Sequence, residues 1–192
     1  MTISALMLVK GDSKRLPNKN VLNFNGKPMF IWNLEKCLEL FKRTYVSSDD
    51  ETILEMAKKA GAIPIRRPKE LCGDTPNIPV YQHALSKMVF SRAIVAVQAN
   101  SPTIKSSIIA SIRILMNKCG YSEIMTCCED YSIYGSVWAI SRKKLLKYGD
   151  PYKPTPDILI KDISVDIHSK EDLILANKQF YEQSIRNSRR RS

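Results

Sequence analysis

Positively charged side chains gather in one early segment of this sequence, Lys10-Gly-Asp-Ser-Lys-Arg-Leu-Pro-Asn-Lys-Asn20. Four cations fall within ten residues of that segment: Lys10, Lys14, Arg15 and Lys19. Gly11 gives the backbone freedom and Ser13 adds a hydroxyl, so ammonium groups and main-chain N–H donors could together surround a polyphosphate. The segment is not a Walker A loop, because the spacing G-x-x-x-x-G-K-[ST] is absent. A solvated basic loop without a ligand is the alternative.

Short apolar runs alternate with amphipathic stretches along the chain, and these elements must position the basic segment. The apolar runs predict buried strands at 3–9, 44–47, 62–65, 94–98, 122–127, 136–140 and 163–167. Helical spacing predicts helices at 28–38, 51–60, 79–90, 103–118, 141–148 and 169–183. Pro28 suits a first helical turn, Asp49 or Asp50 can cap the second helix, and Ser141 can cap the fifth.

This alternation indicates an α/β fold with a mainly parallel sheet flanked by helices. In such sheets, ligands bind beyond the carboxyl ends of the strands. Four polar segments come at predicted strand ends: 10–20, 47–50, 98–102 and the region around 166–168. We therefore expect these four segments to converge on one binding site.

Length and charge narrow the class of protein. The 192 residues fit one domain over 1–185, followed by a basic tail at 186–192 that we expect to be disordered. The net charge of +11 suits an anionic ligand such as a nucleotide or a sugar acid, and also nucleic acid. No nucleic-acid-binding motif is present, so nucleic acid is not the expected partner.

The cysteines and the short apolar runs indicate the cellular compartment in which we expect the protein. Five cysteines, none in a C-x-x-C pair, and only two histidines give little support for a zinc site or a disulfide framework. The apolar runs are too short to span a membrane, and the amino-terminal residues lack the pattern of a secretory leader. We expect a reduced, cytoplasmic protein without a membrane partner.

The basic segment resembles the amino-terminal signature of the CMP-N-acylneuraminate synthetases and the related CMP-Kdo synthetases, roughly A-R-x-x-S-K-R-L-P-x-K-N. The matching positions are 13–17, Lys19 and Asn20, and Gly26-Lys-Pro28 matches the G-K-P before the family's first helix. Four further blocks follow in the family's order: Val46-Ser-Ser-Asp49, Arg67-Pro-x-Glu-Leu-x-x-Asp74-Thr75, Gln98-x-x-Ser-Pro102 and Val165-Asp-Ile-His-Ser-Lys-Glu-Asp-Leu173. Five blocks in one order make the resemblance specific.

The resemblance implies a Rossmann-like nucleotidyltransferase fold and a cytidylyltransferase activity. The anomeric hydroxyl of an acidic sugar, such as the nonulosonic acid N-acylneuraminate, would attack the α-phosphorus of CTP and release pyrophosphate. Such a reaction mainly needs in-line positioning and neutralisation of the phosphate charge. The alternatives are a different sugar or polyol acceptor, a different base, or a homologue that binds nucleotide with impaired catalysis.

The resemblance also implies roles for single residues. Lys14 and Lys19 would hold and neutralise the triphosphate, and Gln98 would orient the sugar, so these three are the expected catalytic residues. The nucleotide-binding residues would be Lys10, Gly11, Ser13, Arg15, Asn20, Arg67 and Asp74. Among them, Asn20 would bind cytosine or position the loop, and Arg67 would lie near the ribose or the base.

A metal site is implied at Asp166, which matches a family carboxylate that holds Mg²⁺. The alternative for Asp166 is a charge at the amino terminus of the following helix. His168 replaces a second metal-binding Asp of the family, and imidazole is a poor Mg²⁺ ligand. Either one carboxylate suffices, or Mn²⁺ is accepted, or activity is reduced; His168 could also be a surface or cap residue. Asp162 and Asp172 are nearby carboxylates that could contribute.

Two further departures from the family concern the phosphates and the sugar. Lys10 replaces an Arg, which keeps the charge and loses bidentate recognition of phosphate. Only nine residues separate Thr126 from Ser136, where the family has a long insertion that binds the sugar and builds the dimer. Tyr134 also replaces the family's Asn. A homodimer therefore stays an open expectation, and the acceptor sugar is not specified.

Overall fold

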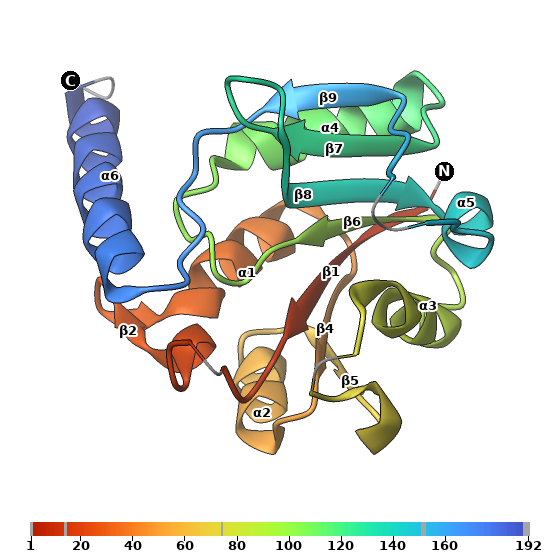
Figure 1. Cartoon of the computed structure of the whole chain (residues 1–192), viewed down its shortest axis with the longest axis horizontal. Helices are drawn as coiled ribbons and strands as arrows, with labels where there is room; N and C mark the ends of the chain where they lie inside the picture. The colour runs from red at the N-terminus through yellow and green to blue at the C-terminus, as the bar shows by residue number, and fades with distance from the viewer. Residues whose placement is uncertain (1, 14, 74, 151–152, 190–192) are drawn as a thin grey trace.

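The computed structural model describes residues 2–13, 15–73, 75–150 and 153–189. Its centre is a seven-stranded sheet with the strand order β5-β4-β1-β6-β8-β7-β9 (Figure 1). The strands are β1 (Ile3–Val9), β4 (Thr44–Ser48), β5 (Ile63–Arg66), β6 (Ala93–Val97), β7 (Glu123–Cys127), β8 (Ile133–Ser141) and β9 (Ile158–Lys161). All neighbouring pairs are parallel except those of β8, which runs antiparallel to β6 and β7. The predicted α/β fold with a mainly parallel sheet is confirmed.

Helices cover both faces of this sheet. They are α1 (Met29–Leu40), α2 (Glu51–Lys59), α3 (Asn77–Lys87), α4 (Ser106–Lys118), α5 (Arg142–Leu146) and α6 (Lys170–Arg189). Side chains alternate across β1, so Ala5 and Met7 pack with α1, α2 and α4, whereas Leu6 packs with α3 and α5. Among the described residues, every helix is too short or too polar to span a lipid bilayer.

The predicted helix caps agree with the structure. Asp50 accepts a hydrogen bond from the main-chain nitrogen of Ile53 (3.0 Å) and so begins α2. Ser141 accepts from the main-chain nitrogen of Lys144 (3.3 Å) and so begins α5. Each side-chain oxygen satisfies a main-chain donor that the first turn of a helix leaves unpaired.

A third hydrophobic cluster joins α6 to the body of the protein. The short ribbon of β2 (Asn23–Phe24) and β3 (Lys27–Pro28) supplies Phe24, whose ring meets the edge of Phe180 at a centroid distance of 5.4 Å. Trp32 of α1 meets Phe180 at 4.6 Å. Ile167 is fully buried in the same cluster, so the segment that precedes α6 is anchored there.

The predicted strand at 163–167 is wrong, because the last strand is β9 and it ends at Lys161. Val165 donates its main-chain N–H to Thr103 Oγ1 (3.1 Å), and Ile167 donates to the carbonyl of Asn100 (2.9 Å). Val165 and Ile167 therefore pack toward α6 and the loop after β6 instead of joining the sheet, whereas Ile163 is exposed. The result is that Asp166 is carried to the end of β6.

The helix predicted to end at 183 continues to Arg189, so residues 186–189 of the expected tail belong to α6 in the structure. No Gly or Pro interrupts this stretch. Hydroxyls of Ser184 and Ser188 bond back to the carbonyls of Tyr181 and Ile185 (2.7 and 2.8 Å), which keeps them compatible with the helix. The remainder of the expected tail, 190–192, lies outside the described residues.

Candidate active site

Polar side chains line one cavity of about 520 Å³ at the carboxyl ends of β1, β4 and β6. The four polar segments expected to converge all contribute to it. The predicted site residues that line the cavity are Lys10, Ser13, Arg15, Lys19, Asn20, Arg67, Gln98, Asp166 and His168. Two others, Lys14 and Asp74, lie outside the described residues. The convergence follows from the topology, since parallel strands end at one edge of the sheet.

Gly11 supports this wall without lining it. Its main-chain N–H donates to Asp49 Oδ1 (3.0 Å), which ties the first loop to the end of β4. A Cβ at Gly11 would lie 2.6 Å from the Cβ of Asp50, the cap of α2, so a larger residue does not fit without movement. Asn20 Nδ2 donates to the carbonyl of Lys10 (2.9 Å) and closes the loop upon itself. These contacts hold the main chain of the loop, and Lys10 Nζ donates in addition to the carbonyl of Gly73 (2.5 Å), another residue of the cavity lining.

Arg67 is a buried cation in the same cavity, with 4% of its surface exposed. Its Nη2 donates to the carbonyl of Ser47 (3.0 Å), and its Nε has no hydrogen-bond partner among the described residues. Burial lowers the pKa of Arg67, and burial raises the pKa of its cavity neighbour Tyr81 to about 12. A buried donor without a partner suits an oxygen of a bound ligand.

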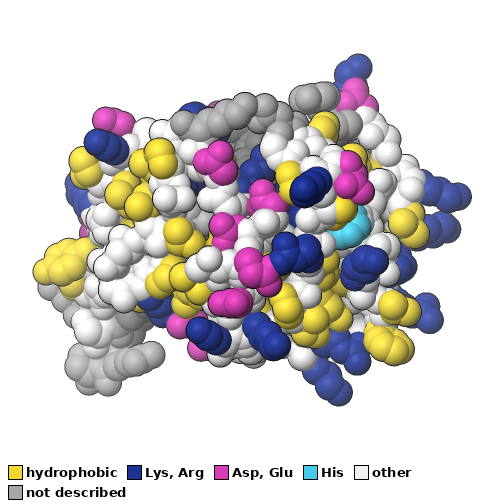
Figure 2. Space-filling view, turned by 90° about the horizontal axis from the view of Figure 1, so that it is seen from below, with side chains coloured by type: hydrophobic (Ala, Val, Ile, Leu, Met, Phe, Trp, Pro, Cys, Tyr) yellow, Lys and Arg dark blue, Asp and Glu magenta, His cyan; other side chains and the backbone are white. Residues whose placement is uncertain are grey.

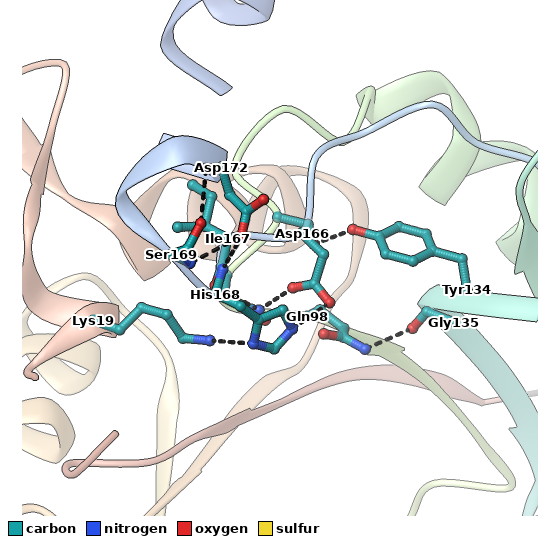
Figure 3. Close-up of polar contacts among 11 residues, drawn as sticks. Lys19, Gln98, Tyr134, Gly135, Asp166, Ile167, His168, Ser169 and Asp172 are labelled. Atoms are coloured by element: carbon teal, nitrogen blue, oxygen red, sulfur yellow. Dashed lines mark hydrogen bonds and ion pairs between the residues drawn. The ribbon is translucent and has the colours of Figure 1, made fainter. Parts of the chain in front are cut away.

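Lys19, His168 and Asp166 follow one another along one side of the cavity (Figure 3). Lys19 Nζ lies 3.4 Å from His168 Nδ1, and His168 Nε2 lies 2.7 Å from Asp166 Oδ2. Asn100 Nδ2 donates to Asp166 Oδ1. Burial lowers the pKa of Lys19, while the charge of Asp166 opposes that shift. The cavity therefore presents an ammonium group and a carboxylate joined through an imidazole.

Two side chains of α1 form hydrogen bonds with the loop that follows β6 and hold it in place. Asn33 Nδ2 donates to the carbonyls of Gln98 and Ser101 (both 2.8 Å), and Lys36 Nζ donates to the carbonyls of Pro102 and Ile104 (both 2.7 Å). These two side chains satisfy four carbonyls of one loop. Their anchoring places the loop's side chains at the cavity.

Gln98 lines the cavity, and Tyr134 lies on the side of Asp166 away from Lys19 in Figure 3. Gln98 Nε2 donates to the carbonyl of Gly135 (3.1 Å), and the Tyr134 hydroxyl lies 2.9 Å from Ser101 Oγ. Burial raises the pKa of Tyr134. Tyr134 stays neutral and can act as a hydrogen-bond donor or acceptor beside the acidic residue.

The other carboxylates near Asp166 are already engaged. Asp162 is 4% exposed and accepts hydrogen bonds from Ser136 Oγ and Ser164 Oγ. Asp172 Oδ2 accepts from the main-chain nitrogens of His168 and Ser169 (both 2.9 Å), and these bonds lower its pKa. Neither residue lines the cavity, so the expected contribution of Asp162 and Asp172 to a metal site is not seen.

The amino terminus of α6 is capped without Asp166. Ser169 Oγ accepts from the main-chain nitrogen of Asp172 (3.2 Å), while Asp172 accepts from Ser169, which is a reciprocal capping box. Asp166 is therefore not needed as a cap of this helix, and its alternative role as a charge near the helix end stays a prediction. Its carboxylate faces the cavity.

Asp166 is suited to hold a divalent cation only together with a ligand. Among the described residues, no group of three or more His, Cys, Asp or Glu side chains is arranged to hold a metal ion. Mg²⁺ usually binds through one or two carboxylates, with phosphate oxygens and water completing its shell. Asp166 fits that pattern, in a cavity whose lining also includes the carboxylates of Asp12 and Asp49, provided that the ligand supplies phosphate oxygens.

Several residues of this site were not among the predicted site residues, for example Asp12, Asp49, Tyr81 and Asn100 of the lining and Asn33 behind it. Asp49 belongs to a block that resembles the family, yet only the block was noted. Asn33 interrupts the apolar face of the first helix between Phe30 and Cys37, and a polar residue at such a position is a signal that could have found it. Asn100 gives no comparable signal, because its partner Asp166 lies far along the chain.

The face drawn in Figure 2 carries charges of both signs. On its described part, Asp and Glu side chains lie among Lys and Arg side chains across the centre, and Lys and Arg predominate toward the right edge. A clustered basic surface is the usual electrostatic footprint of a nucleic-acid-binding protein.

Comparison with known proteins decides the family. A family model described as cytidylyltransferase matches residues 5–145. The chain belongs to the cytidylyltransferase family. The matched region contains β1 to β8 and therefore most of the cavity wall, whereas Asp166 and His168 lie beyond it. The resemblance that the sequence blocks indicated is confirmed.

The relatives of this member of the cytidylyltransferase family include two proteins whose names give a nonulosonic acid as the substrate. The pseudaminic acid cytidylyltransferase of Campylobacter jejuni is 41% identical over 80 residues, covering 40% of this chain and 34% of that protein. The N-acylneuraminate cytidylyltransferase of Escherichia coli is 27% identical over 191 residues, covering 93% of this chain and 43% of that protein. The chain thus spans less than half the length of these relatives.

Solved structures agree with the cytidylyltransferase fold. A CMP-2-keto-3-deoxy-manno-octonic acid synthetase complexed with CTP has a TM-score of 0.76 and 13% identity, covering 95% of this chain and 100% of that one. A Mycobacterium tuberculosis protein solved as a complex with manganese has a TM-score of 0.68 and 13% identity, covering 93% and 99%. At these identities the likeness supports the fold alone, which matches the prediction of a Rossmann-like nucleotidyltransferase.

Proposed function

We propose that this protein transfers CMP from CTP to an acidic sugar and releases pyrophosphate. The observation that carries the proposal is the convergence of Lys10, Arg15 and Lys19 with Arg67 and Asp166 on one cavity. These residues come from segments that are far apart in the sequence. A triphosphate with its metal ion and a base has the charges and donors that such a lining would recognise.

The nucleotide would lie along the wall formed by the first loop. Lys10, Arg15 and Lys19 would neutralise the phosphates. Lys14 would be a fourth cation, and this role is inferred from the sequence. The proposed contacts of Gly11, Ser13 and Asp74 with the nucleotide are also inferred from the sequence. Arg67 would donate its free Nε–H to an oxygen of the ribose or the base. Asn20 would position the loop, since its amide is already bonded to the carbonyl of Lys10.

In the proposed reaction the sugar's anomeric oxygen forms a bond to the α-phosphorus as the bond to pyrophosphate breaks, and the proton of the hydroxyl is released to solvent water. Asp166 would hold Mg²⁺, or Mn²⁺, and a bound divalent cation would offset charge that develops on the phosphate oxygens. Gln98 would help to orient the sugar with its amide oxygen, because its amide nitrogen is used by Gly135. Tyr134 would bound the acceptor side.

The acceptor is proposed to be a nonulosonic acid. The names of the relatives from Campylobacter jejuni and Escherichia coli support this class, and 3-deoxy-manno-octulosonate cytidylyltransferases are also among the relatives. The short segment between Thr126 and Ser136 leaves open a different sugar or polyol. A homodimer and a cytoplasmic location remain predictions from the sequence.

The test is an assay of pyrophosphate release from CTP in the presence of Mg²⁺ and one acidic sugar at a time. The panel of sugars includes N-acylneuraminate, pseudaminic acid and Kdo. Release that requires one of these sugars supports the proposal, and the same panel with ATP, GTP and UTP tests the base. Binding of CTP without turnover under Mg²⁺ or Mn²⁺ would instead favour a catalytically impaired nucleotide-binding homologue.

A further inference from the structure

We propose that His168 positions Asp166 as a hydrogen-bond donor and is not itself a metal ligand. The inference deepens the proposed function, on which its catalytic meaning rests, because it concerns the residue that replaces the family's second metal-binding Asp. Its basis is the placement of the two imidazole nitrogens between groups of opposite hydrogen-bonding character (Figure 3).

The Nδ1 side of the ring faces a donor. Lys19 Nζ lies 3.4 Å from His168 Nδ1, and an ammonium group has three donors and no acceptor. The contact is favourable only when Nδ1 carries a lone pair. In a neutral imidazole, the proton must then be on Nε2.

The Nε2 side of the ring faces an acceptor. Asp166 Oδ2 lies 2.7 Å from His168 Nε2, and an ionised carboxylate can only accept hydrogen bonds. The tautomer with its proton on Nε2 therefore satisfies both neighbours at once. The other neutral tautomer would direct Nδ1–H toward the ammonium group and leave two acceptors facing each other at Asp166.

Metal binding through Nε2 would undo this arrangement. A ligating nitrogen must lose its proton, so the hydrogen bond to Asp166 would be lost and the proton would move to Nδ1, against Lys19. The hydrogen-bonded arrangement instead makes His168 an outer-shell partner of the carboxylate, as is common around metal ligands. Asn100 donates to the second oxygen, Oδ1, so both oxygens of Asp166 are oriented.

The consequence is that both oxygens of Asp166 are oriented at a cavity whose lining also includes Asp12 and Asp49. Each carboxylate oxygen has two lone-pair positions, so Asp166 can accept these two hydrogen bonds and still bind a cation. A single carboxylate gives little affinity for Mg²⁺ alone. We therefore expect the metal to bind mainly together with the triphosphate, whose oxygens complete its shell.

Nitrogen NMR of the nucleotide-free protein tests the tautomer directly. The chain has only two histidines, so a His83→Asn variant assigns the signals of His168. We expect the proton on Nε2 and a lone pair on Nδ1, and no loss of the Nε2 proton when Mg²⁺ is added. A proton on Nδ1, or an Nε2 that loses its proton upon addition of Mg²⁺ or Mn²⁺, overturns the inference.

Variants of the two neighbours test the cause. Lys19→Glu replaces the donor beside Nδ1 with an acceptor, and the fraction of rings that carry the proton on Nδ1 is then expected to rise. The control Lys59→Glu changes the same charge on the exposed end of α2 and is expected to leave the tautomer unchanged. An unchanged tautomer in Lys19→Glu would show that Lys19 does not set it.

Metal affinity separates positioning from ligation. His168→Ala is expected to weaken the binding of Mn²⁺ about tenfold in the presence of CTP, because the carboxylate loses a hydrogen bond that orients it. Electron paramagnetic resonance measures this affinity. His168→Gln keeps an N–H donor near the place of Nε2 and is expected to restore most of the affinity, while His83→Gln is the matched control. Equal losses in His168→Ala and His168→Gln would contradict positioning. Because the tautomer is measured without nucleotide, failure of the proposed activity would leave that result standing.

Discussion

The side-chain amide of Asn33 donates to the main-chain carbonyl of Gln98 at 2.8 Å. Asn33 is fully buried in α1, and the same nitrogen also reaches the carbonyl of Ser101 (2.8 Å). The core thus contains a polar contact whose effect is to set the position of a loop at the cavity. Replacing Asn33 should therefore affect both stability and the site.

Asn33→Leu should lower the free energy of unfolding by about 2–4 kcal/mol, because two buried carbonyls lose their donor. It should also raise the KM for the sugar acceptor, since Gln98 is no longer fixed. Urea unfolding and steady-state kinetics measure the two effects, with Glu39→Gln on the exposed face of α1 as the control. A variant as stable as the parent protein would contradict this role of Asn33.

Gly11→Ala tests the tight packing of the first loop. The added Cβ would lie 2.6 Å from the Cβ of Asp50, so either the loop or the start of α2 must move. We expect a loss of about 1–3 kcal/mol of stability and weaker binding of CTP, measured by thermal unfolding and calorimetry.

Gly149→Ala is the matched control for that change, because nothing lies within 4 Å of a Cβ at Gly149. The control should bind CTP like the parent protein. If Gly11→Ala behaved in the same way as Gly149→Ala, the close approach to Asp50 would have no functional meaning.

The sequence predicted those parts of the fold that depend on local patterns. The run 3–9 became β1, and Asp50 and Ser141 begin helices as their side-chain chemistry indicates. The strand expected at 163–167 failed, because an alternating apolar pattern does not state what it packs against. In this protein Val165 and Ile167 face α6 and not the sheet.

In the candidate site, too, local sequence patterns could be interpreted and contacts between distant residues could not. Its basic loop could be found from composition and from the family blocks, whereas the contact between Asn100 and Asp166 joins positions 66 residues apart. The identity of His168 raised the question of a metal ligand, and no pattern in the sequence could place Lys19 on one side of its ring and Asp166 on the other. Such pairings arise from tertiary structure alone.

Asp166→Ala should abolish metal-dependent release of pyrophosphate while the protein remains folded. The reason is that Asp166 is the carboxylate among Asp162, Asp166 and Asp172 that lines the cavity. Pyrophosphate release and thermal unfolding are measured together, and Glu171→Ala removes an exposed carboxylate nearby as the control. Activity near that of the parent protein in Asp166→Ala would remove this residue from the mechanism.

Lys14→Ala should lower turnover by about tenfold or more, because a charge contact to a transferring phosphate contributes several kcal/mol to the transition state. Lys14 lies outside the described residues, so this prediction rests on its match to the family block and on the position of the loop. The measurement is kcat with CTP at saturation. Lys59→Ala, at the exposed end of α2, controls for the loss of a positive charge, and an unchanged kcat in Lys14→Ala would contradict the role.

The pH dependence of stability should report on Lys36, which bonds to the loop carbonyls of Pro102 and Ile104. Burial lowers the pKa of Lys36 from 10.5 to about 8. Between these two pH values the unfolded chain binds a proton that the folded protein has released. Stability contributed by this group therefore rises as the pH increases from 8 to 10.5, by up to about 3 kcal/mol.

Lys36→Met removes this pH-dependent contribution. As the pH rises from 8 to 10.5, the unfolding free energy of the parent protein should therefore increase relative to that of the variant. Urea unfolding at several pH values measures it, and Lys59→Met on the exposed end of α2 corrects for loss of a positive charge as such. A difference that is constant from pH 8 to 10.5, or that shifts in favour of Lys36→Met, would mean that the three acceptors around the ammonium group outweigh its burial.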